Sequence, residues 1–338
     1  MHSAAARGIL EKQQPSAGAI GMKGERSMNR SEEITFTGSD GKTTIFASVW
    51  ESEGPCRATV QICHGMAEHI GRYDRLAADL TARGFRVCGD DHLGHGRTAR
   101  TKEELGYFGE RDGFLHMMED EHLLRLRMQE GREEEPYFLL GHSMGSFITR
   151  LYISRHGEGL SGYLCCGTSG RNPLVKLAIL MSNLAVFFAG GQKTGRFLNR
   201  LAFKDYNSRF ENAVTGHEWL SRDLAVYAPY ANDPRANFVF TNAGFRDLFH
   251  LLDSVTGRKW SDRVPKDLPV ILLSGTMDPV GQYGKGVRQV YGWLKDAGVR
   301  DLTLKLYEDA RHELHNELNR DEFIDDIVTW IEAHMPAR

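Results

Sequence analysis

The chain has 338 residues, of which 41% are hydrophobic and 26% charged, and its formal net charge is -3. This length is enough to bury a large core. The small net charge and the absence of a long basic block exclude a protein that binds nucleic acid through its charge. No run of 18 uninterrupted apolar residues occurs, because the nearest, residues 174–189, is broken by Lys176, Ser182 and Asn183. We therefore expect no membrane span.

Residues 1–27 are rich in Ala, Gly, Ser and Gln and lack the apolar stretch of a signal peptide. We expect a disordered extension there, with Met28 as an alternative start. The cysteine count is odd, and no C-x-x-C pair occurs among Cys56, Cys63, Cys88, Cys165 and Cys166. Three of these cysteines lie within strand-like apolar runs, and we expect them to be reduced and buried. Reduced cysteines are typical of a cytoplasmic protein.

The predicted elements begin with two β-rich runs, residues 33–37 and 43–50, whose Gly/Asp-containing connection predicts an antiparallel hairpin. Strands and helices then alternate. We expect strands at 58–63, 85–89, 136–140, 162–166, 269–273 and 302–307, and helices at 72–83, 116–130, 147–155, 284–297 and 321–334. Repeated β-α-β units with continuously apolar strands predict an α/β fold with a mostly parallel sheet and helices on both faces.

Residues 170–263 interrupt this alternation, because they contain helical patterns but no convincing strand of the main sheet. We interpret them as a helical cap inserted into a core formed by residues 28–169 and 264–338. Ligands of open α/β sheets bind at the carboxyl ends of the strands. A cap at that end would form a lid over the site.

The strongest chemical signal is Gly141-His142-Ser143-Met144-Gly145, between a predicted strand and a predicted helix. In that context G-x-S-x-G indicates a nucleophile elbow, in which a sharp turn presents the serine hydroxyl at the top of the sheet. A chance occurrence in a chain with 36 glycines is the competing interpretation. The flanking strand and helix favour the elbow, with Ser143 as nucleophile.

A serine needs a base, and the base needs an orienting acid. Asp278 follows the strand at 269–273, and His312 follows the strand at 302–307, so both belong at the same sheet edge as Ser143. Their order along the chain is that of the elbow-containing hydrolases. Either residue alone could be structural, and His315 remains a rival base.

Acyl transfer also needs N–H donors for the oxyanion. One comes from the residue after the nucleophile, Met144, and the other from the loop after the third strand, where Met66 is the candidate. Gly65 allows close approach of the backbone. We interpret His64 and His69 as residues whose hydrogen bonds anchor the loop, and we prefer this role to that of metal ligands. We expect neither metal nor cofactor.

The chain resembles the monoacylglycerol lipase and lysophospholipase branch of the α/β-hydrolases, which includes serine aminopeptidase S33-like enzymes. The resemblance is carried by H-G-M-A-E-H at 64–69, D-D-H-L-G-H-G-R-T at 90–98, G-H-S-M-G at 141–145, S-G-T-M-D-P-V at 274–280 and A-R-H-E-L-H-N-E at 310–317. It implies a triad of Ser143, Asp278 and His312, oxyanion donors at Met66 and Met144, and no cofactor. Ser146 departs from the pattern, since relatives commonly have glycine there.

The expected activity is hydrolysis of monoacylglycerol or lysophospholipid-type esters through an acyl-enzyme. The apolar cap segment 174–188, followed by basic residues, could line an acyl tunnel and touch a membrane surface, or form the cap's own core. We expect substrate contacts from Gly65, His142, Leu184, Phe187 and Phe188. A short-chain esterase, thioesterase or aminopeptidase and, less favoured, a non-catalytic protein of this fold remain alternatives. Epoxide and haloalkane hydrolases are disfavoured, because they use Asp at the position of Ser143.

Overall fold

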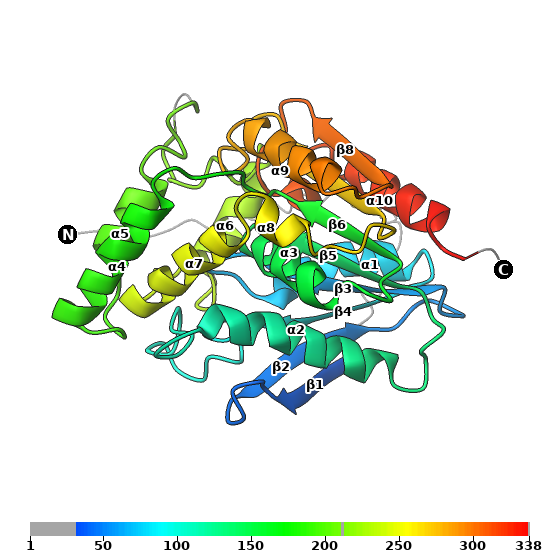
Figure 1. Ribbon diagram of the computed structural model, residues 1–338, viewed down its shortest axis with the longest axis horizontal. Coiled ribbons are helices and arrows are strands. Elements are labelled where there is room, and N and C mark those ends of the chain that lie inside the picture. Colours follow the sequence, from blue (N-terminus) through cyan, green and yellow to red (C-terminus); the bar gives the residue numbers. More distant parts are fainter. Residues whose placement is uncertain (1–31, 211–212, 337–338) are drawn as a thin grey trace, which may run out of the picture.

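The computed structural model describes residues 32–210 and 213–336, so the expectation for residues 1–27 lies outside the described part. One eight-stranded sheet has the order β1-β2-β4-β3-β5-β6-β7-β8 (Figure 1). The strands are β1 (Glu32–Thr37), β2 (Thr44–Trp50), β3 (Ala58–Cys63), β4 (Phe85–Asp91), β5 (Tyr137–His142), β6 (Gly162–Cys166), β7 (Val270–Gly275) and β8 (Leu302–Tyr307). Strands β1 and β2 form an antiparallel hairpin, β2 pairs antiparallel with β4, and all remaining pairs are parallel. The predicted mostly parallel sheet and its leading hairpin are confirmed.

Helices cover both faces of the sheet because its central strands are apolar on both sides. One face packs against α1 (Asp74–Thr81) and α10 (Arg320–Ala333), through side chains such as Leu80 and Ile327. The other face packs against α2 (Gly113–Gln129), α3 (Met144–His156) and α9 (Lys285–Asp296), through side chains such as Met117, Ile148 and Val290. The core therefore consists of two apolar layers separated by the sheet.

Several boundaries differ from the sequence prediction, and a tertiary contact explains one of them. Strand β5 continues to His142 and α3 begins at Met144, so a single residue separates strand from helix at the elbow. Helix α2 begins at Gly113 instead of 116. The amide of Gly113 donates to the Asp247 carboxylate at 3.0 Å, and Asp247 lies in the distant helix α7 (Asn242–Ser254). Because the carboxylate that caps the N-terminus of α2 comes from so far along the chain, the sequence around residue 113 does not show where the helix begins.

Between β6 and β7 the chain forms the helices α4 (Val175–Ala189), α5 (Arg196–Phe203), α6 (Tyr227–Asn232), α7 and α8 (Arg258–Ser261). Helices α4 and α7 pack together, and Figure 1 shows α4 and α5 at one end of the molecule, away from the sheet. Within residues 32–210 and 213–336, every helix is too short or too polar to cross a bilayer. The division into a cap of residues 170–263 and a core stays a prediction.

The register of the parallel strands brings their carboxyl ends to one edge. Cys63 pairs with Gly141, His142 with Cys166, and Gly275 with Tyr307. The segments that follow β3, β5, β7 and β8 carry Gly65, Ser143, Asp278 and His312, respectively. Residues separated by up to about 250 positions therefore meet at a single sheet edge.

Candidate active site

The elbow at Ser143 has the strained backbone that this turn requires. Ser143 has φ 55° and ψ -121°, a conformation that non-glycine residues rarely adopt. A Cβ atom on Gly145 would overlap the Cys63 carbonyl oxygen, and one on Gly141 would overlap the Thr149 hydroxyl. Both glycines of G-x-S-x-G are thus required by the close packing of α3 against β3 and β5.

Ser146, the departure from the family pattern, strengthens the same turn. Its hydroxyl donates to the Ser143 carbonyl at 2.6 Å and contacts the Thr168 hydroxyl at 2.8 Å. Arg150 donates to the Thr168 hydroxyl at 3.0 Å. Ser146 is fully buried, so its small polar side chain ties the elbow to the segment after β6.

The structure brings Asp278 and His312 into direct contact. His312 Nδ1 lies 3.0 Å from Asp278 Oδ1 and 3.1 Å from Oδ2, and both residues are buried. The Val280 amide donates to Asp278 Oδ1 at 2.8 Å, and the Ser274 hydroxyl donates to Oδ2 at 3.3 Å. A carboxylate held in this way fixes the imidazole tautomer with hydrogen on Nδ1, which leaves the lone pair on Nε2.

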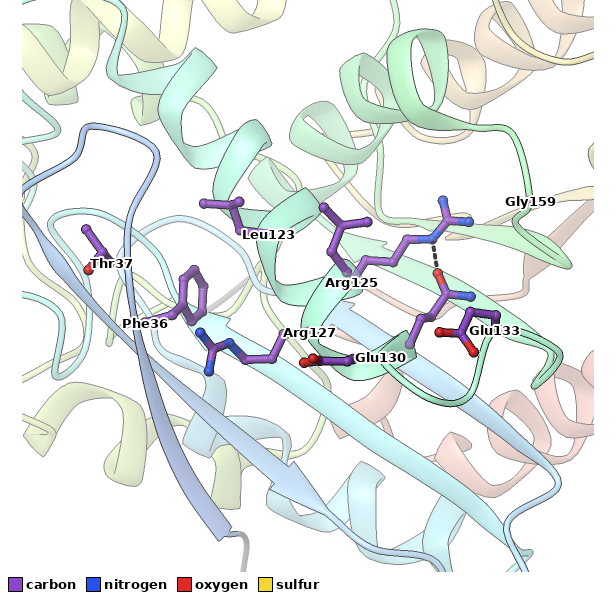
Figure 2. A pocket seen from close by; sticks show the side chains of 10 residues that line it. Phe36, Thr37, Leu123, Arg125, Arg127, Glu130, Glu133 and Gly159 are labelled. Atoms are coloured by element: carbon purple, nitrogen blue, oxygen red, sulfur yellow. Dashed lines mark hydrogen bonds between the residues drawn. The ribbon is translucent and has the colours of Figure 1, made fainter.

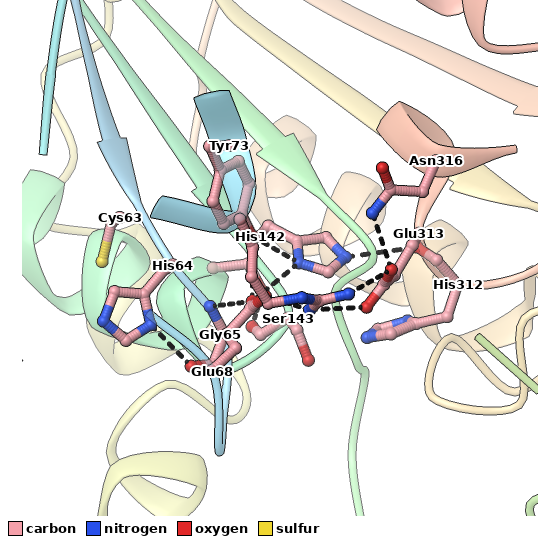
Figure 3. A network of polar contacts seen from close by, with 12 residues as sticks. Cys63, His64, Gly65, Glu68, Tyr73, His142, Ser143, His312, Glu313 and Asn316 are labelled. Carbon is pink, nitrogen blue, oxygen red and sulfur yellow. Dashed lines mark hydrogen bonds and ion pairs between the residues drawn. The ribbon is translucent and has the colours of Figure 1, made fainter. Parts of the chain in front are cut away.

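The second ring nitrogen of His312, Nε2, is left without a partner in the described part of the chain. Nε2 is buried and has no hydrogen-bond partner within the described residues. The His312 ring lies 4.8 Å, between centroids, from that of His142, the neighbour of Ser143 (Figure 3), and 5.1 Å from that of Trp219. A buried nitrogen without a partner calls for an explanation, and a role as catalytic base is one.

His315, the rival base, is placed differently. Its ring stacks on Tyr73 with centroids 4.6 Å apart and meets His142 edge-on at 5.1 Å. Burial, together with the neighbouring charge of His142, lowers the pKa of His315 to about 3. The Asp278 carboxylate contacts His312, so the geometry favours His312 as the base.

The candidate oxyanion loop, residues 64–69, passes directly beside the nucleophile. A Cβ atom on Gly65 would lie 3.1 Å from Ser143 Cβ, so only glycine allows this approach without displacement. Met144 is the first residue of α3, and the backbone N–H groups in the first turn of a helix have no acceptor within the helix. The loop is anchored as expected for its two histidines, because His64 Nδ1 contacts the Gly65 carbonyl at 2.8 Å and His69 Nε2 contacts Asp233 at 2.7 Å.

The residues predicted to contact substrate fall into two groups. His142 is buried and bonds to Tyr73 and to the His312 carbonyl, at 2.9 and 3.2 Å, and Gly65 is also buried beside Ser143. By contrast, the exposed fractions of Leu184, Phe187 and Phe188 are 47%, 80% and 79%. These three side chains face outward from α4, and their contact with substrate remains a prediction.

Three residues near the oxyanion loop could offer metal ligands. Atoms of Cys63, His92 and Glu121 lie within 4.8 Å of one another, and all three residues are buried. However, Nδ1 of His92 faces the Asp90 carboxylate and Nε2 faces the His64 carbonyl, both at 3.1 Å. Two acceptors require hydrogen on both nitrogens, which leaves no lone pair for a metal. Burial opposes this charge, but Asp90 outweighs burial and raises the pKa of His92 to about 9.

A groove of about 860 Å³ lies far from these residues, between β1 and α2 (Figure 2). Its walls include Phe36, Leu126 and Arg127, together with Arg125, which donates to Gln129 at 2.7 Å. The groove contains none of the predicted site residues. Its lining contains no serine or cysteine that could act as a nucleophile, and we assign it no role in catalysis.

Sequence reasoning missed a buried polar network around the loop. Glu68 binds Arg72, Arg72 binds Glu313, and Tyr73 binds Glu68 and His142 (Figure 3). The spacing of Glu68 and Arg72, four residues apart, was the available signal, but such pairs are usually exposed. The packing of the Trp219 ring on His312 is a second contact that the sequence analysis did not predict.

A parallel sheet of this order with an elbow serine and a paired Asp and His at one edge defines a serine hydrolase of the α/β-hydrolase fold. Residues 54–319 match the model of the family described as serine aminopeptidase, S33, and the chain belongs to this family.

Individual relatives agree with this assignment. Monoglyceride lipase from Rattus norvegicus is 30% identical over 297 residues, which cover 85% of this chain and 86% of that protein. Monoacylglycerol lipase from Mycolicibacterium smegmatis is 29% identical over 313 residues, which cover 91% and 99%. Among solved structures, a thermostable carboxyl esterase from Bacillus coagulans in complex with glycerol is similar, with a TM-score of 0.85, 35% identity and coverage of 91% and 99%.

Proposed function

We propose that this protein hydrolyses monoacylglycerol or lysophospholipid-type carboxylic esters through an acyl-enzyme on Ser143. The observation that carries the proposal is the Asp278–His312 pair at 3.0 Å, whose buried Nε2 has no partner among the described residues, at the same sheet edge as the strained elbow serine. Relatives named monoglyceride and monoacylglycerol lipases support the substrate class.

The proposed reaction has two half-reactions. His312 Nε2 takes the Ser143 proton as Oγ attacks the ester carbonyl, and the amides of Met66 and Met144 hold the oxyanion. The tetrahedral intermediate collapses, and His312 returns its proton to the leaving alcohol. Water, deprotonated by His312, then attacks the acyl-enzyme, and Ser143 regains its proton as the fatty acid leaves. Asp278 stabilises the imidazolium in both steps.

The test of the activity is a panel of 1-monoacylglycerols and p-nitrophenyl esters with acyl chains of 2 to 16 carbons. Each methylene buried in an acyl site contributes up to about 0.8 kcal/mol, so kcat/KM should rise with chain length up to a plateau. A preference for acetate over decanoate would replace the lipid assignment with a short-chain esterase. Faster cleavage of aminoacyl amides or thioesters would favour those alternatives.

For the cap we propose peripheral contact with a membrane from the cytoplasmic side. The support is a set of exposed apolar side chains on α4, on α5 and at the residue before α4. This apolar cap surface consists of Leu174, Leu177, Leu180, Leu184, Phe187, Phe188, Phe197 and Leu201. Exposed Lys193, Arg196 and Arg200 adjoin this surface in the chain. Apolar side chains flanked by cations are typical of helices that lie in a membrane interface.

Vesicle sedimentation tests this contact with liposomes of phosphatidylcholine and phosphatidylglycerol. The double variant Phe187→Ser/Phe188→Ser should lose most of the bound fraction, and circular dichroism checks that its fold is intact. Leu126→Ser is the matched control, because Leu126 is 55% exposed on α2, outside the cap. Equal binding by the wild type and the double variant would exclude the apolar cap surface as the contact.

A further inference from the structure

The loop that carries the candidate oxyanion donor and the loop that carries His312 are joined through one buried arginine. Arg72 Nη1 and Nη2 each lie 2.9 Å from a carboxylate oxygen of Glu313, the residue after His312. The same Nη1 pairs with Glu68 of the oxyanion loop. The exposed fractions of these side chains are 11% for Arg72 and 3% for each glutamate.

On the oxyanion side, Glu68 fixes the backbone next to Met66. Glu68 Oε1 accepts a hydrogen bond from the Gly65 amide at 2.6 Å and another from the Tyr73 hydroxyl at 2.9 Å. The Gly65 amide precedes the Met66 amide by one peptide. Its hydrogen bond to Glu68 therefore limits the rotation that would turn the Met66 N–H away from the oxyanion.

On the histidine side, Glu313 is held by backbone and side-chain contacts. Its amide donates to the Leu220 carbonyl of the cap segment at 2.7 Å, and Asn316 donates to its carboxylate at 2.8 Å. Arg72 also lies over the Tyr230 ring of α6, 4.6 Å from its centroid. One guanidinium thus touches the oxyanion loop, the histidine loop and the cap.

A second route joins the same loops through Tyr73 and His142. The Tyr73 hydroxyl gives its hydrogen to Glu68, so its oxygen accepts from His142 Nδ1 at 2.9 Å. His142 Nε2 donates to the His312 carbonyl at 3.2 Å, which makes His142 a cation. Burial opposes this charge, but the contact with Glu68 outweighs it and raises the pKa of His142. Two cations then balance the two buried carboxylates, as a stable buried ionic cluster requires.

We infer that Arg72 is a positioning residue, which acts through Glu68 and Glu313 to set the oxyanion loop against the loop of His312. This inference rests on the proposed triad and oxyanion hole. Only arginine can bind two carboxylates at once in this way, because its planar guanidinium presents several N–H donors in fixed directions, whereas lysine supplies a single point charge. Removal of Arg72 frees both loops, and a misplacement of about 1 Å at a reacting group costs about 10²-fold in rate.

The experiment compares Arg72→Gln, Arg72→Lys and Glu313→Gln with the wild type on an oxygen ester and on its thionoester analogue. Sulfur accepts hydrogen bonds weakly, so the rate ratio of ester to thionoester reports on the oxyanion donors. Arg72→Gln should lower kcat about 10²-fold with KM nearly unchanged and should lower this ratio. Arg72→Lys should be intermediate, and it replaces Arg72→Gln if the latter does not fold. The double variant Arg72→Gln/Glu313→Gln should be no slower than Arg72→Gln alone, because both substitutions break the same ion pair.

Arg83→Gln is the matched control, since Arg83 makes a surface ion pair with Asp325 at 2.9 Å and should change kcat less than twofold. The inference is overturned if folded Arg72→Gln keeps its kcat, or if it loses rate on both substrates equally with the ratio unchanged. The second result would mean a purely structural role. A wild type that cleaves neither ester, or that a fluorophosphonate probe does not label at Ser143, would instead refute the proposed function.

Discussion

At the scale of single residues, the proposed mechanism depends on the Ser143 hydroxyl. Ser143→Ala keeps the buried elbow and removes only the nucleophile. We expect kcat to fall by roughly 10⁴ to 10⁶. Steady-state hydrolysis of a monoacylglycerol and labelling by a fluorophosphonate probe measure the loss, and circular dichroism checks the fold. Unchanged turnover by the variant would refute the assignment of the nucleophile.

Asp278 is the second residue with a specific prediction. In Asp278→Asn, an amide NH₂ can face His312 Nδ1, which then carries the lone pair and leaves hydrogen on Nε2. The imidazole cannot accept the Ser143 proton in that tautomer, so kcat should fall by about 10⁴. Asp309→Asn is the control: Asp309 is exposed in the loop before His312, at φ 54°, a conformation that asparagine tolerates. A similar loss in both variants would mean that the loop, and not the carboxylate at 278, matters.

At the scale of elements, the approach of α3 to β3 makes Gly145 irreplaceable. The Cβ atom in Gly145→Ala would overlap the Cys63 and His64 carbonyls, so helix and strand must separate. The free energy of unfolding should fall by at least about 1–3 kcal/mol, as measured by urea denaturation. Gly292→Ala in α9 is the matched control, because its Cβ meets open space and should stabilise the protein by about 0.5–1 kcal/mol. A stability of Gly145→Ala equal to that of the wild type would contradict this account of the elbow.

At the scale of the whole molecule, the buried cluster between β4 and α2 makes stability depend on pH. Burial, reinforced by Asp90, raises the pKa of Glu121 to about 8, and Asp90 raises that of His92 to about 9. Both groups hold protons in the folded state at pH values where the unfolded chain has released them. The stability they contribute is therefore complete at low pH and is lost as pH rises, between about 4.5 and 8 for Glu121 and between about 6.5 and 9 for His92.

Urea denaturation at pH values from 5 to 9 measures this dependence. The free energy of unfolding should fall with pH, by at most about 1.4 kcal/mol per pH unit for each proton retained. Glu121→Gln should flatten the fall below pH 8, whereas Glu103→Gln, which changes an exposed loop carboxylate, should leave it unchanged. A wild-type stability that rises from pH 5 to pH 8 would show that other groups dominate.

The fold class and the candidate triad could be predicted from the sequence, because both depend on local pattern and chain order. Alternating strands and helices specify a parallel sheet, and the carboxyl ends of parallel strands meet at one edge. Ser143, Asp278 and His312 each lie in the segment that follows a strand, so their placement at one edge could be expected from the sequence. The antiparallel hairpin β1–β2 was likewise visible from its loop residues.

Only the tertiary structure decided which charged residues are buried together and which apolar ones are exposed. Arg72 and Glu313 lie 241 positions apart, and nothing local shows that they form a buried ion pair. The apolar run of α4 fits a buried helix equally well, yet Phe187 and Phe188 face outward. Burial depends on how distant segments pack, and the same side chain in the same local pattern can become core, surface or part of a site.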